Sequence, residues 1–361
     1  MKKKINKEQI TRFFIMFLLI LFKYIEVWSY LFTKEFFKSK FIVGVAIVMI
    51  IIIIAKIKIP KNKFLKILKS ALICVGITLL TKSVDYIVFF VLSILYFQIK
   101  DGDKKFIKHY LLSTFILFVV TIILSLLGIL PSFTITRIVN NEIVTRYNLG
   151  FLGANSLFMF FYPIVISFLY LKFNSHKSKK ILYSIVIFLI TFIFYNYTNC
   201  RTGMLCIFLI IIVYLNSSKL NYKVIRFLLK YYYIIFFIIS IIFALNFNAY
   251  DDILNRLSSG RFYYWNYYIQ NVGYSFFGTS PIKGIPIDNI YISSLYYYGL
   301  ISTILCFIVS LLPYKNKTIK NEYYFIVLAF STYGFFENNV AYVYNFLTFF
   351  QLYYYINSKK K

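Results

Sequence analysis

Long apolar segments follow one another along the whole chain and restrict what it can fold into. A helix needs about 20 apolar residues to cross the hydrocarbon core of a bilayer, because each residue advances it by about 1.5 Å. Twelve segments approach this length, and they lie near 12–33, 41–59, 67–81, 84–99, 109–130, 151–171, 181–198, 202–216, 229–247, 289–312, 323–336 and 339–356. Hydrophobic residues make up 60% of the chain, against about half in soluble domains. The sequence therefore predicts an all-α polytopic membrane protein with about 12 transmembrane helices, folded as a single integral membrane domain over residues 1–361.

Two of the breaks between these segments follow from helix length and from charge. A single helix over residues 323–356 would be about 50 Å long, well beyond a hydrocarbon core of about 30 Å. We therefore predict a turn at residues 337–339. A single helix through Lys82 and Asp85 would bury both charges, and it would put the flanking lysine clusters on opposite sides of the membrane. Lysine and arginine prefer the cytoplasmic side, so we predict a second break there.

The 40 lysines and arginines are distributed unevenly across the predicted topology. With both termini in the cytoplasm, 29 of them lie on the cytoplasmic side, 10 lie outside and Lys23 lies within the first span. This excess supports a multi-pass protein of the bacterial cytoplasmic membrane with both termini cytoplasmic. Only five of the 33 lysines are external, whereas five of the seven arginines are: Arg137, Arg146, Arg201, Arg256 and Arg261. A guanidinium group offers several planar donors, which suits it to bind phosphate oxygens.

The formal net charge of +28 does not indicate a nucleic-acid-binding protein. Such proteins need a basic face on a soluble fold, and here the lysines stand in short clusters between apolar segments. The four cysteines show no C-x-x-C spacing, and no external group of Asp, Glu and His has the spacing of metal ligands. We therefore expect no nucleic-acid partner, no disulfide framework, no metal and no cofactor.

The longest interval without an extended apolar run covers residues 258–299, and most of it belongs to a large external loop predicted at 248–288, between spans 9 and 10. Arg261 and Trp265 are four positions apart, so they would share one face of a helix. Glycines and prolines bend the chain after this helix, and we expect Asp288 to cap the N-terminus of the next one. Shorter external segments are predicted at 131–150, at 199–203 and at Glu337.

Three stretches on the predicted external side combine arginine, glycine and asparagine in distinctive patterns. They read R-x-x-L-G-F-x-x-x-N from Arg146 to Asn155, N-C-R-T-G from Asn199 to Gly203, and G-R-x-x-x-W, F-G-T-x-x-x-x-G, D-N-x-Y and Y-x-G-L from Gly260, Phe277, Asp288 and Tyr297. In this order the stretches resemble the motifs of Wzy-type polysaccharide polymerases, in the O-antigen ligase and polymerase-like superfamily. Ala154 stands where that family commonly has proline, and Asn199-Cys200 where it commonly has serines.

The resemblance implies a GT-C-like enzyme that joins oligosaccharide repeat units, each linked to undecaprenyl pyrophosphate, at the outer face of the membrane. Arg201 and Arg261 would stabilise the charge that develops on the leaving pyrophosphate, and either Asp288 or Glu337 would accept a proton from the attacking hydroxyl. Further candidates for substrate binding are Arg146, Asn155, Arg256, Trp265 and Asn289. The implied partners are the lipid-linked oligosaccharide, the membrane and, optionally, a chain-length regulator.

Two other functions and several structural interpretations stay open at this point. An O-antigen ligase would carry a histidine in the large loop, and residues 248–288 contain none. A flippase or transporter of the lipid-linked unit would place its charges within the spans rather than at one face. Structurally, Arg201 is also interpreted as an interfacial anchor, Arg261 as a cation on an aromatic ring, and Glu337 as a turn residue. Tyrosine triplets at 231–233, 296–298 and 353–355 are interpreted as interfacial belts.

Overall fold

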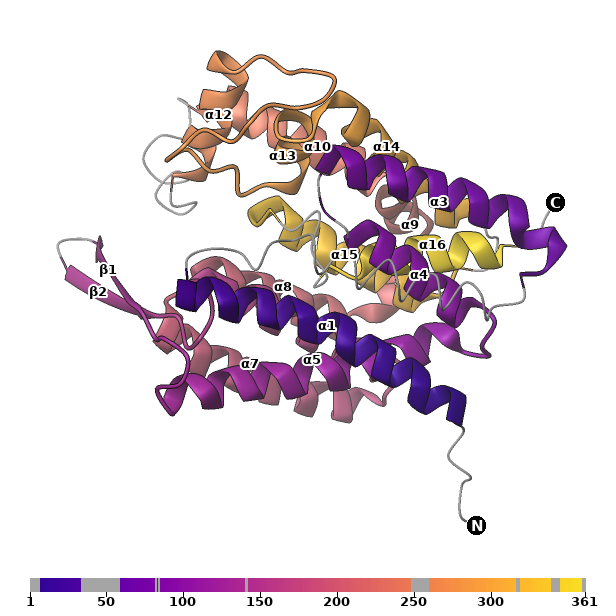
Figure 1. The fold of residues 1–361 in the computed structure, drawn as a ribbon, viewed down its shortest axis with the longest axis horizontal. Coiled ribbons are helices and arrows are strands. Elements are labelled where there is room, and N and C mark those ends of the chain that lie inside the picture. The colour runs from indigo at the N-terminus through magenta and orange to yellow at the C-terminus, as the bar shows by residue number, and fades with distance from the viewer. Residues whose placement is uncertain are drawn as a thin grey trace, which may run out of the picture. The chain divides into compact units, whose positions relative to one another are not determined.

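The computed structural model describes residues 7–33, 59–81, 83, 85–139, 142–247, 260–315, 319–338 and 345–358. Almost all of this chain is helical, and it divides into two compact units (Figure 1). Unit 1 comprises Met1–Lys58 and Ile94–Ser217, and unit 2 comprises Ile59–Ser93 and Ser218–Lys361. Helix α4 (Asp85–Phe97) belongs to both units, because the boundary falls inside it.

Unit 1 is a bundle of antiparallel helices joined mostly by short connections. Its other helices are α1 (Lys7–Thr33), α5 (Gly102–Leu126), α6 (Ala154–Leu171), α7 (Lys177–Thr198) and α8 (Arg201–Leu215), followed by the 3-10 helix η1 (Ser217–Asn221) at the boundary. Helix α5 packs between α1 and α6, and α8 packs against α6 and α7. The core is aromatic: Phe118 contacts the rings of Phe151, Phe161 and Phe194.

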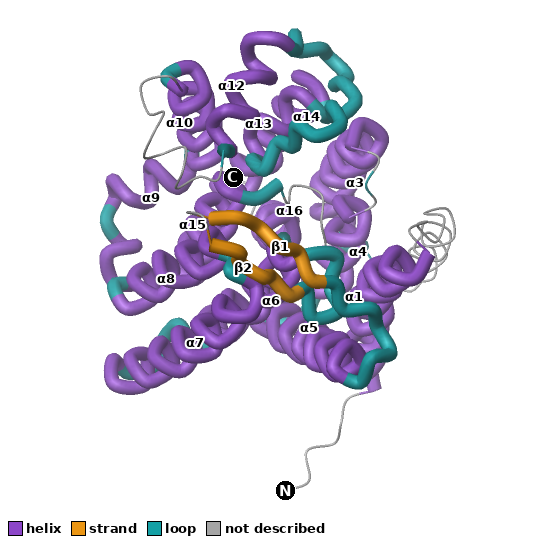
Figure 2. The backbone as a smooth tube through the Cα atoms, turned by 90° about the vertical axis from the view of Figure 1, so that its left-hand side faces the viewer, coloured by secondary structure: helices purple, strands orange, loops and turns teal. Residues whose placement is uncertain are grey.

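The segment predicted as a loop at 131–150 contains a β-hairpin in the structure, the one departure from all-α structure within the described residues. Strands β1 (Thr134–Val139) and β2 (Glu142–Tyr147) pair antiparallel, with Val139 opposite Glu142. The hairpin extends from the end of the bundle at which α5 ends and α6 begins (Figure 2). Both strands are rich in β-branched residues and flank an Asn-Asn dipeptide, a pattern that favours a hairpin.

Unit 2 is a second helical bundle, built around the buried helix α15. Its helices are α3 (Lys61–Thr81), α9 (Lys223–Lys230), α10 (Tyr232–Leu245), α12 (Arg261–Asn271), α13 (Ile290–Tyr296), α14 (Gly299–Leu311), η3 (Leu312–Lys315), α15 (Asn321–Phe336) and α16 (Leu347–Asn357). Helix α15 contacts α9, α10, α13 and α16. Tyr323, Phe325 and Ile326 on α15 are fully buried, as its uninterrupted apolar and aromatic sequence requires.

Each bundle has one end where lysines gather. In unit 1, Lys180 donates a hydrogen bond of 2.7 Å to the Ser217 hydroxyl and lies over the Tyr214 ring. In unit 2, Lys66 donates a hydrogen bond of 2.6 Å to the Ser358 hydroxyl, and Lys315 lies over the Tyr355 ring. We call these the lysine ends. Within each unit, the predicted site residues that the structure describes lie at the opposite end.

Among the described residues, four helices are long and apolar enough to cross a membrane: α3, α5, α6 and α7. A fifth span results if α9 and α10 are counted together, although they are bent by 73° relative to each other. The segment predicted at 289–312 is two helices, α13 and α14, with a break at Tyr297 and Tyr298. The described chain thus has four or five apolar helices that could cross a membrane, whereas the number of 12 spans stays a prediction. The span predicted at 41–59 lies almost entirely outside the described residues.

Both breaks argued from length and charge are confirmed. Helix α3 ends at Thr81 and α4 begins at Asp85, on the two sides of Lys82. Helix α15 ends at Phe336, and α16 begins only at Leu347. Helix length and charge density are local properties of a sequence, which explains why they locate these ends well.

Candidate functional site

Three of the four predicted catalytic residues meet at the end of unit 2 opposite its lysine end. Arg261, the first residue of α12, donates a hydrogen bond of 2.8 Å from Nη2 to Oε1 of Glu337, which follows α15. Its Nε lies 3.5 Å from Oδ2 of Asp288, just before α13. We call these three residues the Arg261 cluster. The cluster joins stretches of the chain up to 76 positions apart.

The two carboxylates of the cluster differ in their access to solvent. The side chains of Arg261 and Glu337 are 8% and 6% exposed, whereas that of Asp288 is 38% exposed. A buried charge is tolerated only with a close partner, because removing an ion from water is costly. Glu337 is therefore the buried counter-ion of Arg261. Asp288 makes the longer contact and presents its carboxylate to the surface.

Aromatic packing fixes α12, and with it Arg261. Trp265 is fully buried, and its ring lies 5.0 Å from that of Phe262 and 5.4 Å from that of Phe335 on α15. Phe262 in turn stacks on Phe243 of α10 at 5.0 Å. The prediction that Arg261 and Trp265 share one helix face is confirmed. Trp265 has no exposed ring face, and in the structure it attaches α12 to α15.

The helix cap predicted at Asp288 is provided by its neighbour. Asn289 Oδ1 accepts hydrogen bonds of 2.9 Å from the backbone N–H groups of Tyr291 and Ile292, while its Nδ2 donates to the Ser240 hydroxyl and to the Phe335 carbonyl. Asn289 is fully buried, so it acts as a structural residue and not as a surface contact for substrate. Because Asn289 takes the cap, the Asp288 carboxylate is left to face Arg261.

A second group of predicted residues lies in unit 1, at the base of the hairpin. Arg146 on β2 donates hydrogen bonds of 2.7 Å from Nε to the Thr198 carbonyl and from Nη2 to Oδ1 of Asn155. The structure thus brings Arg146 and Asn155 together, and it ties both to the end of α7. Asn199 ends α7 in the left-handed conformation, with φ of 49°, and Arg201 begins α8. We call Arg146, Asn155 and Arg201 the Arg146 group.

Arg201 differs from the other arginines of the two groups in its exposure. Its side chain is exposed and, within the described residues, makes no hydrogen bond or ion pair. Two residues later, Gly203 allows α8 to pack closely on α6, because a Cβ there would lie 2.3 Å from Cδ1 of Phe158. In the R-T-G motif, Arg201 thus provides an exposed positive charge, and Gly203 allows the close packing of α8 on α6. Arg256, the remaining predicted ligand, lies outside the described residues.

The N-L-G-F part of the other unit 1 motif also has a structural explanation. Asn148 is buried, accepts a hydrogen bond from the Phe133 N–H at 2.9 Å and donates one to the Phe151 carbonyl. Leu149 and Gly150 both have positive φ, at 48° and 82°. A Cβ on Gly150 would lie 2.9 Å from Cβ of Ser125, so only glycine fits this turn. This turn brings the chain from β2 into α6, and so brings Asn155 beside Arg146.

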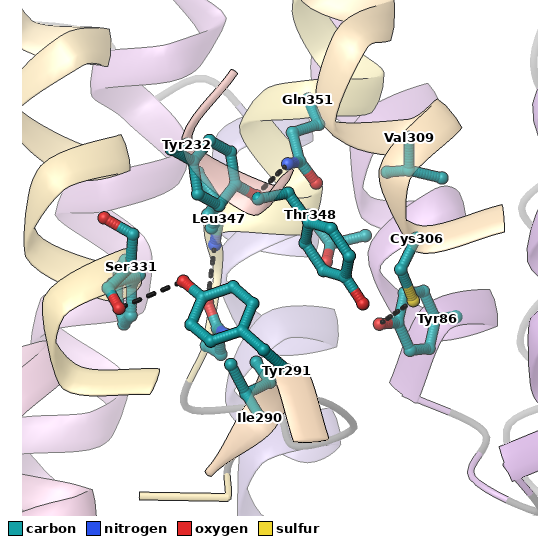
Figure 3. Close-up of a pocket in the computed structure, with 13 residues that line it drawn as sticks. Tyr86, Tyr232, Ile290, Tyr291, Cys306, Val309, Ser331, Leu347, Thr348 and Gln351 are labelled. Carbon is teal, nitrogen blue, oxygen red and sulfur yellow. Dashed lines mark hydrogen bonds between the residues drawn. The ribbon is translucent and has the colours of Figure 1, made fainter. Parts of the chain in front are cut away.

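Unit 2 also contains a small polar cavity that the sequence did not indicate (Figure 3). The cavity has a volume of about 40 Å³. Around it, Gln351 Nε2 donates to the Tyr232 hydroxyl at 2.9 Å and the Tyr291 hydroxyl donates to the Ser331 carbonyl at 3.0 Å. A water molecule needs about 10–15 Å³ of such volume, so the cavity has room for a few waters and not for a sugar ring.

Tyrosines around this cavity also correct the predicted interfacial belts. Tyr232 and Tyr233 line the cavity and are buried at 6% and 7% exposure, so they pack inside the bundle rather than at a lipid interface. Residues 353–355 of α16 are likewise buried. The sequence alone does not determine where these tyrosines lie, because a tyrosine-rich run is equally compatible with a membrane interface and with a polar cavity between helices.

No protein-family model, curated protein or solved structure matches the chain. The likeness to Wzy-type polymerases therefore rests on the motifs alone and stays a hypothesis. Over the part of the chain that the structure describes, no three His, Cys, Asp or Glu side chains are grouped so that they could hold a metal ion. The candidate residues fall into two groups, the Arg146 group in unit 1 and the Arg261 cluster in unit 2.

Proposed function

We propose that the protein is a polysaccharide polymerase of the bacterial cytoplasmic membrane, which joins undecaprenyl-pyrophosphate-linked oligosaccharide units at the outer face. The observation that carries this proposal is the Arg261 cluster. It unites an arginine and a carboxylate from one motif stretch with the carboxylate of Glu337, which comes from a distant part of the chain, and these residue types suit transfer of a glycan to a hydroxyl. The cluster lies at the end of unit 2 away from its lysines, in agreement with an external position under the positive-inside rule.

In the proposed reaction, a hydroxyl oxygen of the acceptor glycan bonds to the anomeric carbon of the donor glycan. The bond from this carbon to the pyrophosphate oxygen breaks, and the leaving pyrophosphate takes the electron pair. The hydroxyl proton passes to a carboxylate. The protein must therefore supply a proton acceptor for one substrate and cationic groups for the charge that develops on the other.

The structure favours Asp288 over Glu337 as the proton acceptor. Asp288 is 38% exposed and holds Arg261 only at 3.5 Å, so a sugar hydroxyl has access to its oxygens. Glu337 is 6% exposed and already accepts a hydrogen bond of 2.8 Å from Arg261. Glu337 then positions Arg261, and Arg261 orients Asp288.

The structure also suggests different roles for the two predicted arginines. Arg261 faces two carboxylates, so the formal charge of its cluster is −1, which is unsuited to hold a pyrophosphate. Arg201 is exposed at the N-terminus of a 15-residue helix, where the backbone N–H groups add to its positive potential. We therefore assign the pyrophosphate contact to Arg201 and the orientation of the proton acceptor to Arg261.

The assignment is tested by Asp288→Asn and Glu337→Gln in a deletion strain whose host attaches glycan to a separable acceptor. Both substitutions preserve shape, but only Asp288→Asn removes the proposed base. We expect Asp288→Asn to abolish the polymer ladder at normal protein level while the acceptor still carries one repeat unit. Glu337→Gln should retain part of the activity, since its amide oxygen can still accept from Arg261.

Each competing function predicts a different glycan pattern for the same Asp288→Asn strain. Absence of external single-unit glycan would point to a flippase, and long polymer left on undecaprenyl pyrophosphate would point to a ligase. A normal ladder with Asp288→Asn would exclude this carboxylate as the base.

A further inference from the structure

The segment 272–279, V-G-Y-S-F-F-G-T, exposes three large aromatic side chains between α12 and α13. Tyr274, Phe276 and Phe277 are 70%, 66% and 72% exposed. We call this segment the aromatic loop. Isolated apolar side chains on a surface are ordinary, but three large rings within four residues form a contiguous patch that needs a partner.

The backbone of the aromatic loop is tightly held even though its rings are exposed. The Leu300 N–H donates to the Ser275 carbonyl at 3.0 Å, and the Thr279 N–H donates to the Tyr296 carbonyl at 2.7 Å. Gly278 and Gly299 lie back to back, since a Cβ on Gly299 would lie 2.4 Å from the Gly278 nitrogen. The loop is thereby attached to the break between α13 and α14, and its aromatic side chains are displayed from a fixed position.

Apolar side chains are also exposed on the two helices that lead away from the attachment point of the aromatic loop. On α14, which begins where the loop is attached, Ile304 and Ile308 are exposed on one face. Helix α3 packs against α14, is long and apolar enough to cross a membrane, and exposes Leu72 and Leu79 at 64% and 74%. The C-terminal end of α14 leads to Lys315 at the lysine end (Figure 1). The loop therefore stands at the end of this apolar face away from the lysines.

We propose that the aromatic loop is a membrane anchor that inserts into the boundary between headgroups and acyl chains, at the bilayer surface opposite the lysine end. Rings of Phe276 and Phe277 lack polar atoms and suit the acyl side of this boundary, whereas the Tyr274 ring carries a hydroxyl that suits the headgroup side. Exposed Lys283, four residues beyond the loop, supplies a cation for lipid phosphates. The anchor fixes the depth of the α12–α13 connection, and hence of Asp288, relative to the bilayer surface.

Tryptophan fluorescence of the full-length protein in vesicles tests this anchor without any measurement of glycan synthesis. Phe277→Trp and, separately, Phe276→Trp place a reporter in the loop, and Ser280→Trp places a matched reporter at an exposed position just outside it. Emission of the parent protein, with Trp28 and Trp265, is subtracted. The vesicles contain phosphatidylethanolamine and phosphatidylglycerol with bromine at defined acyl depths.

We expect the reporters at 276 and 277 to show blue-shifted emission, loss of intensity with shallow acyl bromines and protection from iodide in water. The reporter at Ser280 should emit at longer wavelength and lose intensity with iodide. Iodide quenching at 276 and 277 without bromolipid quenching would overturn the proposal. Protection that appears only after a soluble oligosaccharide is added would identify a glycan-stacking surface instead and would equally overturn it. Because the readout is independent of polymer formation, failure of the proposed enzymatic function leaves this test unaffected.

Discussion

Arg146 and Arg261 each belong to an arginine-containing motif, but the described groups that hold them differ in charge. The two described hydrogen bonds of Arg146 go to neutral acceptors, the Thr198 carbonyl and the Asn155 side chain, which do not cancel its positive charge. Arg261 is held by Glu337 and Asp288, which together outweigh its charge. A carbonyl or amide can orient a guanidinium without cancelling its attraction for phosphate, whereas a carboxylate cannot. Motif membership alone therefore does not establish which arginine is available to bind an anion.

Among the arginine variants, the largest loss of stability is expected for Arg261→Ala. This change leaves two carboxylates beside each other, one of them buried, so we expect a loss of about 3–5 kcal/mol in the free energy of unfolding. Thermal unfolding of the purified protein in detergent measures it. Arg12→Ala is the matched control, because Arg12 forms an ion pair of 3.3 Å with Glu8, which is 70% exposed.

The control should cost about 0.5 kcal/mol, since a pair one turn apart on a helix contributes little when its carboxylate is exposed. Equal shifts in melting temperature for Arg261→Ala and Arg12→Ala would show that burial does not strengthen the Arg261 pair. Arg261→Met combined with Glu337→Leu should restore part of the stability, because it removes both buried charges together. The double variant should still form no polymer.

A smaller loss of stability is expected for Arg146→Ala. The change removes two described hydrogen bonds from a charged donor to neutral acceptors, so we expect about 1–3 kcal/mol. Arg146→Lys should recover little of this loss, because one ammonium on a different stem cannot reproduce the two directions of the guanidinium fork. Chemical denaturation of both variants measures the difference. If lysine restores full stability, the geometry of Arg146 is unimportant and only its charge matters.

The smallest effect on stability is expected for Arg201→Ala, together with a complete loss of polymer. The side chain is exposed, so its removal should leave the melting temperature unchanged. Polymer should disappear from the glycan gel because the proposed pyrophosphate contact is lost, and Arg201→Lys should restore little of it. Thr202→Ser is a mild control in the same helical turn. A normal ladder with Arg201→Ala would leave Arg146 as the only described arginine of unit 1 suited to bind the anion.

The sequence identified the candidate site residues but not the contacts that hold them in place. It identified Arg261, Asp288 and Glu337 as candidates, because polar residues between apolar segments stand out. It did not indicate that they form one cluster, since that depends on α12 packing against α10 and on the Trp265 ring of α12 meeting Phe335 of α15. The hairpin at 134–147 could have been predicted, because two short stretches rich in Ile, Val and Thr stand on either side of Asn140-Asn141.

The sequence by itself determined the helical class with apolar helices long enough to cross a membrane, and the breaks near Lys82 and Glu337. These features depend on hydrophobic length and charge, which are additive along the chain. Tertiary structure decided that Asn289 and not Asp288 caps α13, and that Glu337 is buried against Arg261 while Asp288 stays accessible. The reason is that burial and ion pairing depend on which side chains packing brings within a few ångströms, and for Arg261 and Glu337 those side chains come from positions 76 residues apart.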